Sequence, residues 1–531
     1  FKWVATGGTI SATGEFKAGN TAGKFSVTVT GGQKQGAASI EVTAPVTPTG
    51  LQDPAIGAAV TSAYNDGILN RTEMISILRL AGDDGTVSST ELADYQYLVS
   101  AGAGFVIPDY VRNLANDVVN TNVANAKFQG QTLGNLTAGS TATQLNRLID
   151  KWFFGADVPQ LTTTGLTWTT STGILFPATP SRSDTKQGML GDCYFISALA
   201  AIADRNPNAV RNMFIDNGDG TYTVRFYTGQ YGNFNDNGTM TSGFSNGVGT
   251  ADYVTVNRSL PVSSNGGLVY SGYGLSATST STVLWIALAE KAYAQWNETG
   301  HEGRDGTNRY SAIEGGWMAD VNCQVLGYNS TNFAFASSSK ATLVTALTSQ
   351  RSVTLGTQSA ASSGLVGSHA YVVTGYEAST DTFRLHNPWG TSHPGALTWA
   401  QLQANCSWFV VTDPSGSQSF TSPGSVGGSS SPKTKSIINS NESVGHANSN
   451  TIPSSARTDV VVTRIQLAPA NEFTALGEQN NDARPTEGHV DVSAPTGTRN
   501  RATEFLVLSQ SELDLLISEL AGELLLPLNP V

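Results

Sequence analysis

Cys193 is one of three cysteines in the 531-residue chain, and its neighbours suit a nucleophile. It stands in "QGMLGDCYFISALAAIAD", after two glycines and an aspartate, at the start of an apolar run that ends at Asn206 and Pro207. This run is expected to form a buried helix with Cys193 at its N-terminus. Unpaired N–H groups and the helix dipole there favour a thiolate and lower the thiol pKa from about 8.5. A small apolar residue at the start of a core helix would fit the local pattern equally well.

A nucleophilic thiol needs a base, and His369 is the best placed of the six histidines. It opens "SHAYVVTGYEASTDTFRLHNPWG", in which two strands are expected on either side of a turn at "EAST". Such a hairpin would bring His369 beside Asn387, 18 positions later. The Asn387 amide oxygen could then fix the imidazole tautomer, and Trp389 could shield that hydrogen bond from water. His386 would point to the opposite face of its strand.

These segments resemble the calpain family of cysteine proteases. "QGMLGDCYFISALAAI" is similar to the active-site block of that family, and "GSHAYVVTGYE" and "FRLHNPWG" are similar to its histidine and asparagine blocks, in the same order. Between the blocks, "LWIALAEKAYAQW" and "YSAIEGGWMADV" resemble further family segments, and "NGDGTYTVRFY" and "YVTVNRSLPV" resemble its early strands. The resemblance covers about residues 165 to 414.

The resemblance implies an α+β, papain-like fold in two lobes: a helical lobe around Cys193 and a β-rich lobe that carries His369 and Asn387. It implies an endopeptidase with Cys193 as nucleophile, His369 as base and then acid, and Asn387 as the orienting residue. Gln187 would donate its side-chain amide to the oxyanion hole, together with the Cys193 backbone N–H. The chemistry would need no cofactor, and the substrate would be a protein or peptide.

The chain also departs from the family pattern. Tyr194 follows the cysteine where many calpains have tryptophan, and it would keep the packing role. The family binds calcium at two sites in the protease core, and Asp184, three residues before Gln187, fits one ligand position. The segment "TSHPGALTWAQLQ" after "NPWG" has no acidic residue for the second site. Calcium is therefore expected to act at most as a weakly bound regulator.

The segments on either side of the protease region have different characters. Residues 1–45 alternate with period two and resemble part of a bacterial Ig-like repeat whose first strands would precede Phe1. Residues 51–150 are expected to be helical and contain two degenerate EF-hand-like repeats, "DGILNRTEM" and "DGTVSSTEL". Their upstream calcium-ligand positions hold unsuitable residues, so N-capped helices are the simpler interpretation. In that interpretation, each helix begins with a capping box, formed by Asn70 with Glu73 and by Ser88 with Glu91.

The protease region, residues 151–414, is followed by segments with little expected structure. Residues 415–457 are rich in Ser and Gly and should be a disordered linker. Residues 458–531 form a tail with a strand-like run, "DVVVTRIQL", and an amphipathic helix near its end. The apolar face of that helix consists of Leu513, Leu516, Ile517, Leu520 and Leu524.

Composition limits the partners and the location. The net charge is −12 without any Lys/Arg block, which argues against nucleic acid or an anionic membrane as partner. No apolar run reaches the roughly 18 residues needed to span a bilayer. Only 13% of residues are charged, a composition typical of β-rich extracellular proteins, so a secreted or cell-surface location in a bacterium is expected.

Two alternatives to the peptidase stay open. The Ig-like start and the long linker would suit a surface or adhesion protein that uses a catalytically silent calpain-like domain as a scaffold. A transglutaminase-like acyltransferase on a related fold would also use a cysteine. Those enzymes generally have an aspartate as the third member, and Asn387 favours a protease.

Overall fold

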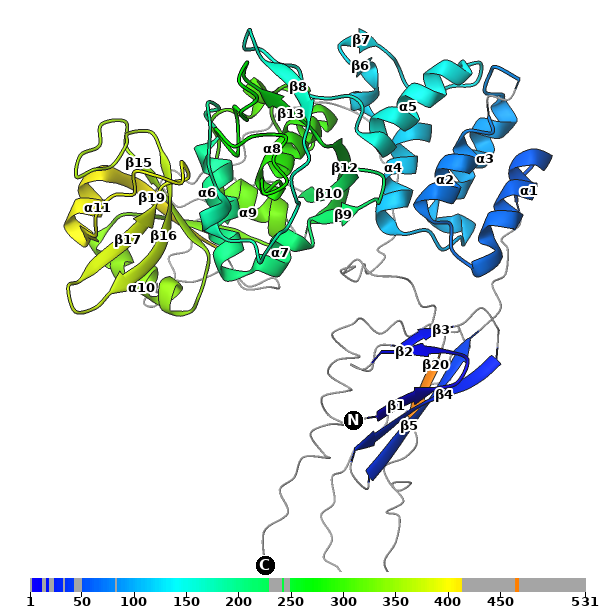
Figure 1. Ribbon diagram of the computed structural model, residues 1–531, viewed down its shortest axis with the longest axis horizontal. Coiled ribbons are helices and arrows are strands. Elements are labelled where there is room, and N and C mark those ends of the chain that lie inside the picture. The colour runs from blue at the N-terminus through cyan, green and yellow to red at the C-terminus, as the bar shows by residue number, and fades with distance from the viewer. Residues whose placement is uncertain are drawn as a thin grey trace, which may run out of the picture. The chain divides into compact units, whose positions relative to one another are not determined.

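The computed structural model describes residues 2–11, 16–18, 23–31, 34–42, 50–81, 84–228, 241–242, 249–412 and 464–467. They form a mixed α+β structure, as the sequence predicts (Figure 1). The chain divides into one compact unit of residues 1–48, 61–68 and 443–531 and a second of residues 49–60 and 69–442. The predicted linker and the predicted C-terminal amphipathic helix lie outside the described residues. No helix in the described part of the chain is both long and apolar enough to cross a membrane.

The first unit contains the strands predicted for residues 1–45. An antiparallel sheet has the order β1-β4-β5-β20, formed by Lys2–Ala5, Gly23–Gly31, Lys34–Val42 and Arg464–Leu467. A separate pair joins β2 (Gly8–Ile10) to β3 (Phe16–Ala18). The last strand of the sheet comes from "DVVVTRIQL", so this run extends the N-terminal sheet. The assignment to an Ig-like repeat stays a prediction.

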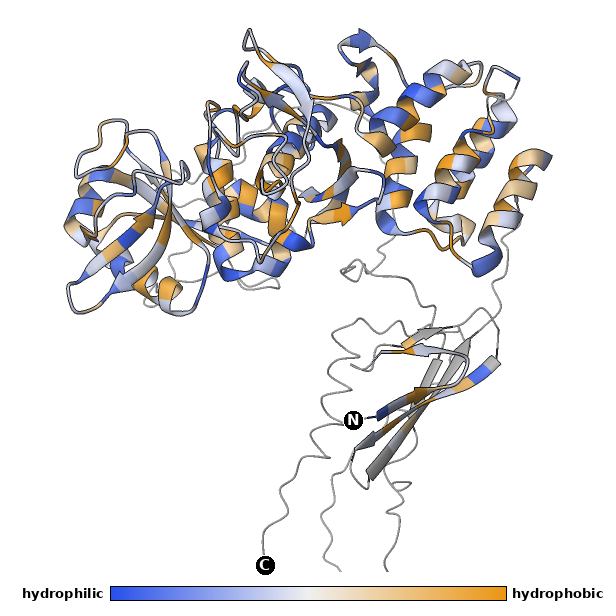
Figure 2. Cartoon of the chain, viewed as in Figure 1, coloured by the Kyte–Doolittle hydropathy of each residue, from blue (hydrophilic) through white to orange (hydrophobic). Residues whose placement is uncertain are grey.

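Residues 50–157 are mainly helical. The helices are α1 (Pro54–Ala63), α2 (Arg71–Leu78), α3 (Ser89–Val99), α4 (Asp109–Val119) and α5 (Ala142–Phe154), with the short strands β6 (Lys127–Phe128) and β7 (Gln131–Thr132) before α5. Both predicted capping boxes form: Asn70 with Glu73 begins α2, and Ser88 with Glu91 begins α3. The two glutamates thus accept backbone N–H groups at helix starts. Figure 2 shows hydrophobic and hydrophilic residues sharing α4 and α5, as expected of helices buried on one face.

A helical lobe follows, with a large hydrophobic core. Its helices are α6 (Cys193–Arg205), α7 (Pro207–Arg211), α8 (Trp285–Trp296) and α9 (Met318–Leu326). Its strands are β8 (Thr167–Thr170), β9 (Phe214–Asp216), β10 (Thr221–Thr228), β12 (Thr250–Asn257) and β13 (Ser259–Val262). In α6, every residue from Tyr194 to Ala203 is buried, as expected of a helix that is apolar all round.

A β-rich lobe with its own core completes the second unit. Its seven-stranded sheet has the order β11-β14-β19-β15-β16-β17-β18. The strands are Thr241–Ser242, Ser330–Ala334, Cys406–Thr412, Val353–Thr357, Ala370–Glu377, Thr382–His386 and Leu397–Thr398, and the helices are α10 (Lys340–Thr348) and α11 (Trp399–Asn405). Two separate cores, one mainly helical and one built on a sheet, are consistent with a papain-like arrangement.

The helical segment of the second unit, residues 69–157, packs directly on the helical lobe through α4, α5 and β12. Gly155, at the end of α5, has φ +57°, and a Cβ there would lie 2.4 Å from the Thr255 carbonyl oxygen, so only glycine fits. The Asn257 side chain donates to the Gly155 carbonyl at 2.8 Å. Arg71 bonds to the Asp219 carboxylate at 2.8 Å. The helical segment is thus fixed to the lobe by packing and by polar contacts.

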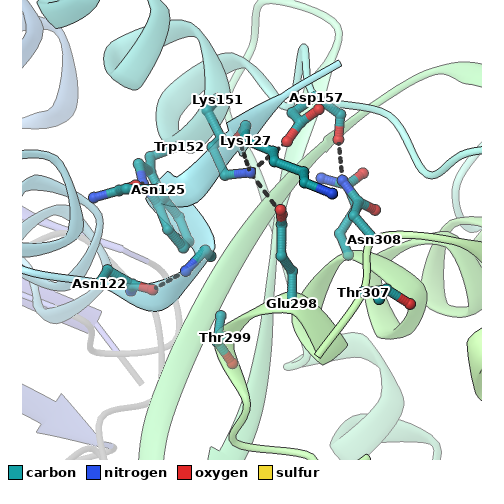
Figure 3. A network of polar contacts seen from close by, with 12 residues as sticks. Asn122, Asn125, Lys127, Lys151, Trp152, Asp157, Glu298, Thr299, Thr307 and Asn308 are labelled. Atoms are coloured by element: carbon teal, nitrogen blue, oxygen red, sulfur yellow. Dashed lines mark hydrogen bonds and ion pairs between the residues drawn. The ribbon is translucent and has the colours of Figure 1, made fainter. Parts of the chain in front are cut away.

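Buried charges make a second connection between these two parts (Figure 3). The Lys151 ammonium lies 2.6 Å from the Glu298 carboxylate, pairs with the Asp157 carboxylate and donates to the Lys127 carbonyl at 3.1 Å. The Asn308 side chain donates to the Asp157 carbonyl at 2.9 Å. Burial raises the pKa of Glu298 to about 7, and Lys151 opposes the rise. All three ammonium donors therefore have acceptors, so the buried cation is fully compensated.

Replacing Lys151 with methionine should destabilise the second unit by about 3–5 kcal/mol, because removing one partner of a buried ion pair leaves the other charges uncompensated. The measurement is urea unfolding followed by tryptophan fluorescence. Lys340→Met is the matched control, since Lys340 pairs with Asp381 at 2.6 Å on the surface. It should cost less than about 1 kcal/mol. Equal costs in the two variants would contradict a stabilising role for the buried network.

Candidate active site

Cys193 is the first residue of α6, which confirms its predicted place at a helix N-terminus. The Asp192 carbonyl begins the helix by accepting from the Phe195 N–H at 2.8 Å. Five residues before the cysteine, a Cβ on Gly188 would lie 2.2 Å from the Val269 carbonyl oxygen, so this position requires glycine. The backbone that leads to Cys193 is therefore held in place by close packing at Gly188, and the residue itself is held by the helix.

His369 and Asn387 lie side by side at the open end of a hairpin. Strands β16 and β17 pair antiparallel, with Val372 opposite His386, as the sequence predicts. The His369 Nε2 lies 3.0 Å from the Asn387 Oδ1. The Asn387 amide nitrogen donates to the Ser392 carbonyl at 3.3 Å, which turns the amide oxygen toward the imidazole. Nε2 therefore carries the proton, and Nδ1 is the nitrogen available to act on sulfur.

Trp389 covers this histidine–asparagine pair. Its ring centroid lies 4.9 Å from that of His369, with the planes tilted by 45°. Its backbone N–H donates to the Asn387 Oδ1 at 3.1 Å. The side chain is still 38% exposed, so the indole lies between the pair and solvent. This is the shielding position that the sequence predicts.

Cys193 and His369 line one cavity of about 660 Å³. Residues of both lobes form its walls; among them are Gly191, Tyr194, Gly316, Thr357, Ala370 and Trp408. The backbone of Ala370, the residue after His369, hydrogen-bonds to the thiol. Within the described residues, no hydrogen bond joins the thiol to the imidazole itself. Catalytic hydrogen bonds are often long without substrate, so the missing bond does not exclude the pair. Both side chains border the same cavity, where a substrate could contact them together.

The protonation of the resting site differs from the expectation. Burial raises the pKa of the Cys193 thiol to about 11, although the hydrogen bond from Ala370 opposes the rise. Burial also lowers the pKa of His369, against the effect of Asn387. Loss of solvation thus outweighs the helix N-terminus, and the expected lowering of the thiol pKa is not found. At neutral pH the resting pair is a thiol and a neutral imidazole, which can take the thiol proton as a base.

Gln187 lies near the site but outside the cavity wall. Its backbone N–H donates to the Pro388 carbonyl at 2.9 Å, which joins this turn to the strand end that carries Asn387. Its buried side-chain amide donates to the Leu190 carbonyl at 2.8 Å. An amide nitrogen has two N–H donors, so one is left for an oxyanion. The oxyanion role of Gln187 stays a prediction.

The calcium-ligand role that the resemblance suggests for Asp184 stays a prediction. The Asp184 Oδ2 accepts from the Trp285 indole N–H at 3.0 Å and from the Ser181 backbone N–H at 2.9 Å. These donors compete with a cation for the same oxygen. Among the described residues, no three His, Cys, Asp or Glu side chains gather as a metal site. The Asp184 carboxylate thus joins the backbone of the turn at Ser181 to Trp285, the first residue of α8.

Two neighbours of the triad were missed in the sequence. The His393 Nδ1 accepts from the Asn387 backbone N–H at 3.0 Å, and its ring stacks on His386 with centroids 4.4 Å apart. Asp192 is fully buried beside Glu290, and burial together with that neighbour raises the pKa of Asp192 well above its usual value. The Asp192 contact joins two segments far apart in the sequence, and the His393 contacts depend on the path of an irregular loop, so spacing alone signals neither.

A partly buried cysteine at a helix N-terminus, a cavity beside it and a histidine held by an asparagine together define a candidate site of the cysteine peptidase class. Residues 160–412 match the family model described as calpain family cysteine protease. This part of the chain, which contains all three residues, is thus similar to the calpain family of cysteine proteases.

Proteins of two animals and a bacterium are similar to part of this chain. The chain is 30% identical over 244 residues to Calpain clp-4 of Caenorhabditis elegans, covering 41% of this chain and 29% of that protein. It is 27% identical over 268 residues to a thiol protease of Porphyromonas gingivalis, covering 43% and 50%. It is 27% identical over 226 residues to human Calpain-14, covering 40% and 29%. The chain thus spans half or less of each of these relatives.

Proposed function

We propose that this chain is a calpain-type cysteine endopeptidase that hydrolyses peptide bonds of proteins through Cys193, His369 and Asn387. The observation that carries the proposal is the shared cavity: the helix that begins at Cys193 and the hairpin that holds His369 to Asn387 open into the same space. The match of residues 160–412 to the model of calpain family cysteine proteases supports the same reaction class.

In the proposed reaction, the Cys193 sulfur attacks the peptide carbonyl carbon while the His369 Nδ1 takes the thiol proton. The backbone N–H of Cys193 and the side chain of Gln187 would stabilise the negative charge on the carbonyl oxygen. The C–N bond then breaks, and the imidazolium returns the proton to the leaving amine, which leaves a thioester on Cys193. Water attacks the thioester with His369 as base, and the thiol is restored as the acid is released.

Asn387 is proposed to act on His369 rather than on the substrate. Its oxygen accepts a hydrogen bond from the Nε2–H at 3.0 Å and thereby keeps Nδ1 unprotonated in the resting site. Its full burial and the cover from Trp389 keep water from competing for that bond. The hydrogen bond limits the rotation of the imidazole. A small rotation is enough for Nδ1 to face first the Cys193 sulfur and then the leaving amine.

Casein incubated with the full chain tests the proposal, with and without a thiol-directed epoxide inhibitor. We expect cleavage that the inhibitor abolishes. The absence of both casein cleavage and epoxide labelling of Cys193 would favour the silent scaffold. Crosslinking of casein through glutamine and lysine would favour the transglutaminase-like acyltransferase. Export to a bacterial surface, supported by the low share of charged residues, is a further proposal, and cell fractionation tests it.

Calcium should not switch the enzyme on at cytosolic micromolar levels. Tight calcium sites combine several oxygen ligands and carboxylate charge, and Asp184 is engaged with Trp285 and Ser181. The measurement is hydrolysis of a fluorogenic peptide by the full chain, in chelator and across a calcium titration. We expect a flat response or a weak rise toward millimolar calcium. A sharp, cooperative rise at micromolar calcium would mean that a calcium site has been missed.

A further inference from the structure

Arg304 holds a stretch of backbone that forms one wall of the cavity. Its Nη1 donates to the Ala312 carbonyl at 3.0 Å and to the Glu314 carbonyl at 3.4 Å, and its Nη2 donates to the Gly315 carbonyl. Its Nε lies 2.6 Å from the carboxylate of Glu302, whose side chain is only 1% exposed. Both terminal nitrogens of the guanidinium therefore donate to backbone carbonyls, and the three carbonyls belong to one short stretch, residues 312–315.

Tyr194 completes this set of contacts from the nucleophile helix. Its hydroxyl donates to the Ile313 carbonyl at 2.9 Å and accepts from the Arg304 Nη2 at 2.8 Å. The guanidinium also lies over the Tyr194 ring, 5.4 Å from its centroid. Four successive carbonyls, from Ala312 to Gly315, are thus held by one arginine and by the residue that follows Cys193. An indole at position 194 has no oxygen to accept from Arg304, so tyrosine here does more than pack.

The held segment is hydrogen-bonded to the backbone two residues before the nucleophile and leads into the cavity. The Gly315 N–H donates to the Gly191 carbonyl at 2.8 Å. Both Gly315 and Gly316 line the cavity. A Cβ on Gly316 would lie 2.5 Å from the Tyr194 ring and 2.7 Å from the Arg304 Nη2, so the segment lies directly against both side chains. A displacement of Arg304 would therefore move the wall.

We propose that Arg304 is a positioning residue that fixes residues 312–316 against the helix of the nucleophile. The inference rests on the proposed function, since this wall is the surface along which a peptide in the cavity would lie. A planar guanidinium binds several carbonyls at once in a fixed geometry, which a lysine ammonium cannot reproduce. Because these contacts hold the wall in place before binding, a long peptide would bind without the entropic cost of ordering residues 312–316.

The test compares Arg304→Lys with the wild-type chain on two fluorogenic substrates, a short amide and an octapeptide that extends on both sides of the scissile bond. A misplaced wall should lower kcat/KM for the octapeptide by about 100-fold and for the short amide by less than about threefold. Alkylation of Cys193 by iodoacetamide, which is too small to need the wall, should keep its rate. Arg309→Lys is the matched control, because Arg309 pairs with Asp305 at 2.7 Å in a partly exposed ion pair.

Hydrogen exchange gives a readout that does not depend on catalysis. In Arg304→Lys, the Gly315 amide should lose protection while amides in the middle of α6 keep theirs. Unchanged protection at Gly315, or equal losses on the two substrates, would overturn the positioning role. A wild-type chain that cleaves no peptide would instead overturn the proposed function, and Gly315 exchange would still decide whether Arg304 holds the wall.

Discussion

Cys193→Ala should abolish peptide hydrolysis, with a loss of about 10⁴-fold or more, and leave the fold intact. The loss is large because no other group in the cavity can form the acyl-enzyme, and removal of a triad nucleophile leaves only binding and oxyanion stabilisation. The fold should survive because Cys193 is only partly buried at the edge of the helical-lobe core and alanine keeps its Cβ there. Initial rates on a fluorogenic peptide and a thermal melt measure the two effects.

The other two cysteines provide the control. Cys323 is fully buried and Cys406 is 2% exposed, and burial raises the pKa of Cys406 to about 12. Neither should react with an active-site alkylating agent while the chain is folded. Mass spectrometry of the labelled protein should find the adduct on Cys193 alone. Full activity in Cys193→Ala, or an adduct on Cys323 or Cys406, would place the nucleophile elsewhere.

The sequence was sufficient where the chemistry depends on local structure. An apolar run after a glycine-rich turn predicts where α6 starts, because helix boundaries follow from nearby residues. Two alternating runs around "EAST" predict the hairpin, and antiparallel pairing then brings His369 to Asn387 without knowledge of any other segment. The two capping boxes in residues 51–150 were predictable for the same reason.

The sequence was insufficient where the outcome depends on burial or on distant segments. The thiol pKa was expected to fall, but the loss of solvation is set by how both lobes close around Cys193, and a linear pattern does not contain that information. Lys151 and Glu298 are 147 positions apart, and Tyr194 and Arg304 are 110 apart. Such pairs exist only after the chain has folded. For this reason the sequence predicts only a packing role for Tyr194 and no role for Arg304.

His369 is expected to act as one unit with Cys193, so their losses should not multiply. His369→Ala alone should lower kcat by about 10⁴-fold or more, because the thiol, with its pKa raised to about 11, is almost fully protonated at pH 7 without a base. Once the base is absent, the nucleophile contributes little to the rate, so its removal causes little further loss of kcat. The double variant should therefore be no more than about tenfold slower than the slower single variant.

His386→Ala is the matched control for the choice of imidazole. His386 lies one position before Asn387, but its ring stacks on His393 and its Nε2 lies 3.3 Å from the Thr185 hydroxyl, and it does not line the cavity. It should lose less than about tenfold in kcat/KM, a loss typical of a small shift in a supporting residue. A multiplicative loss in the double variant would show that Cys193 and His369 act separately. A collapse in His386→Ala with His369→Ala still active would instead make His386 the base, since only one of the two rings can take the proton from sulfur.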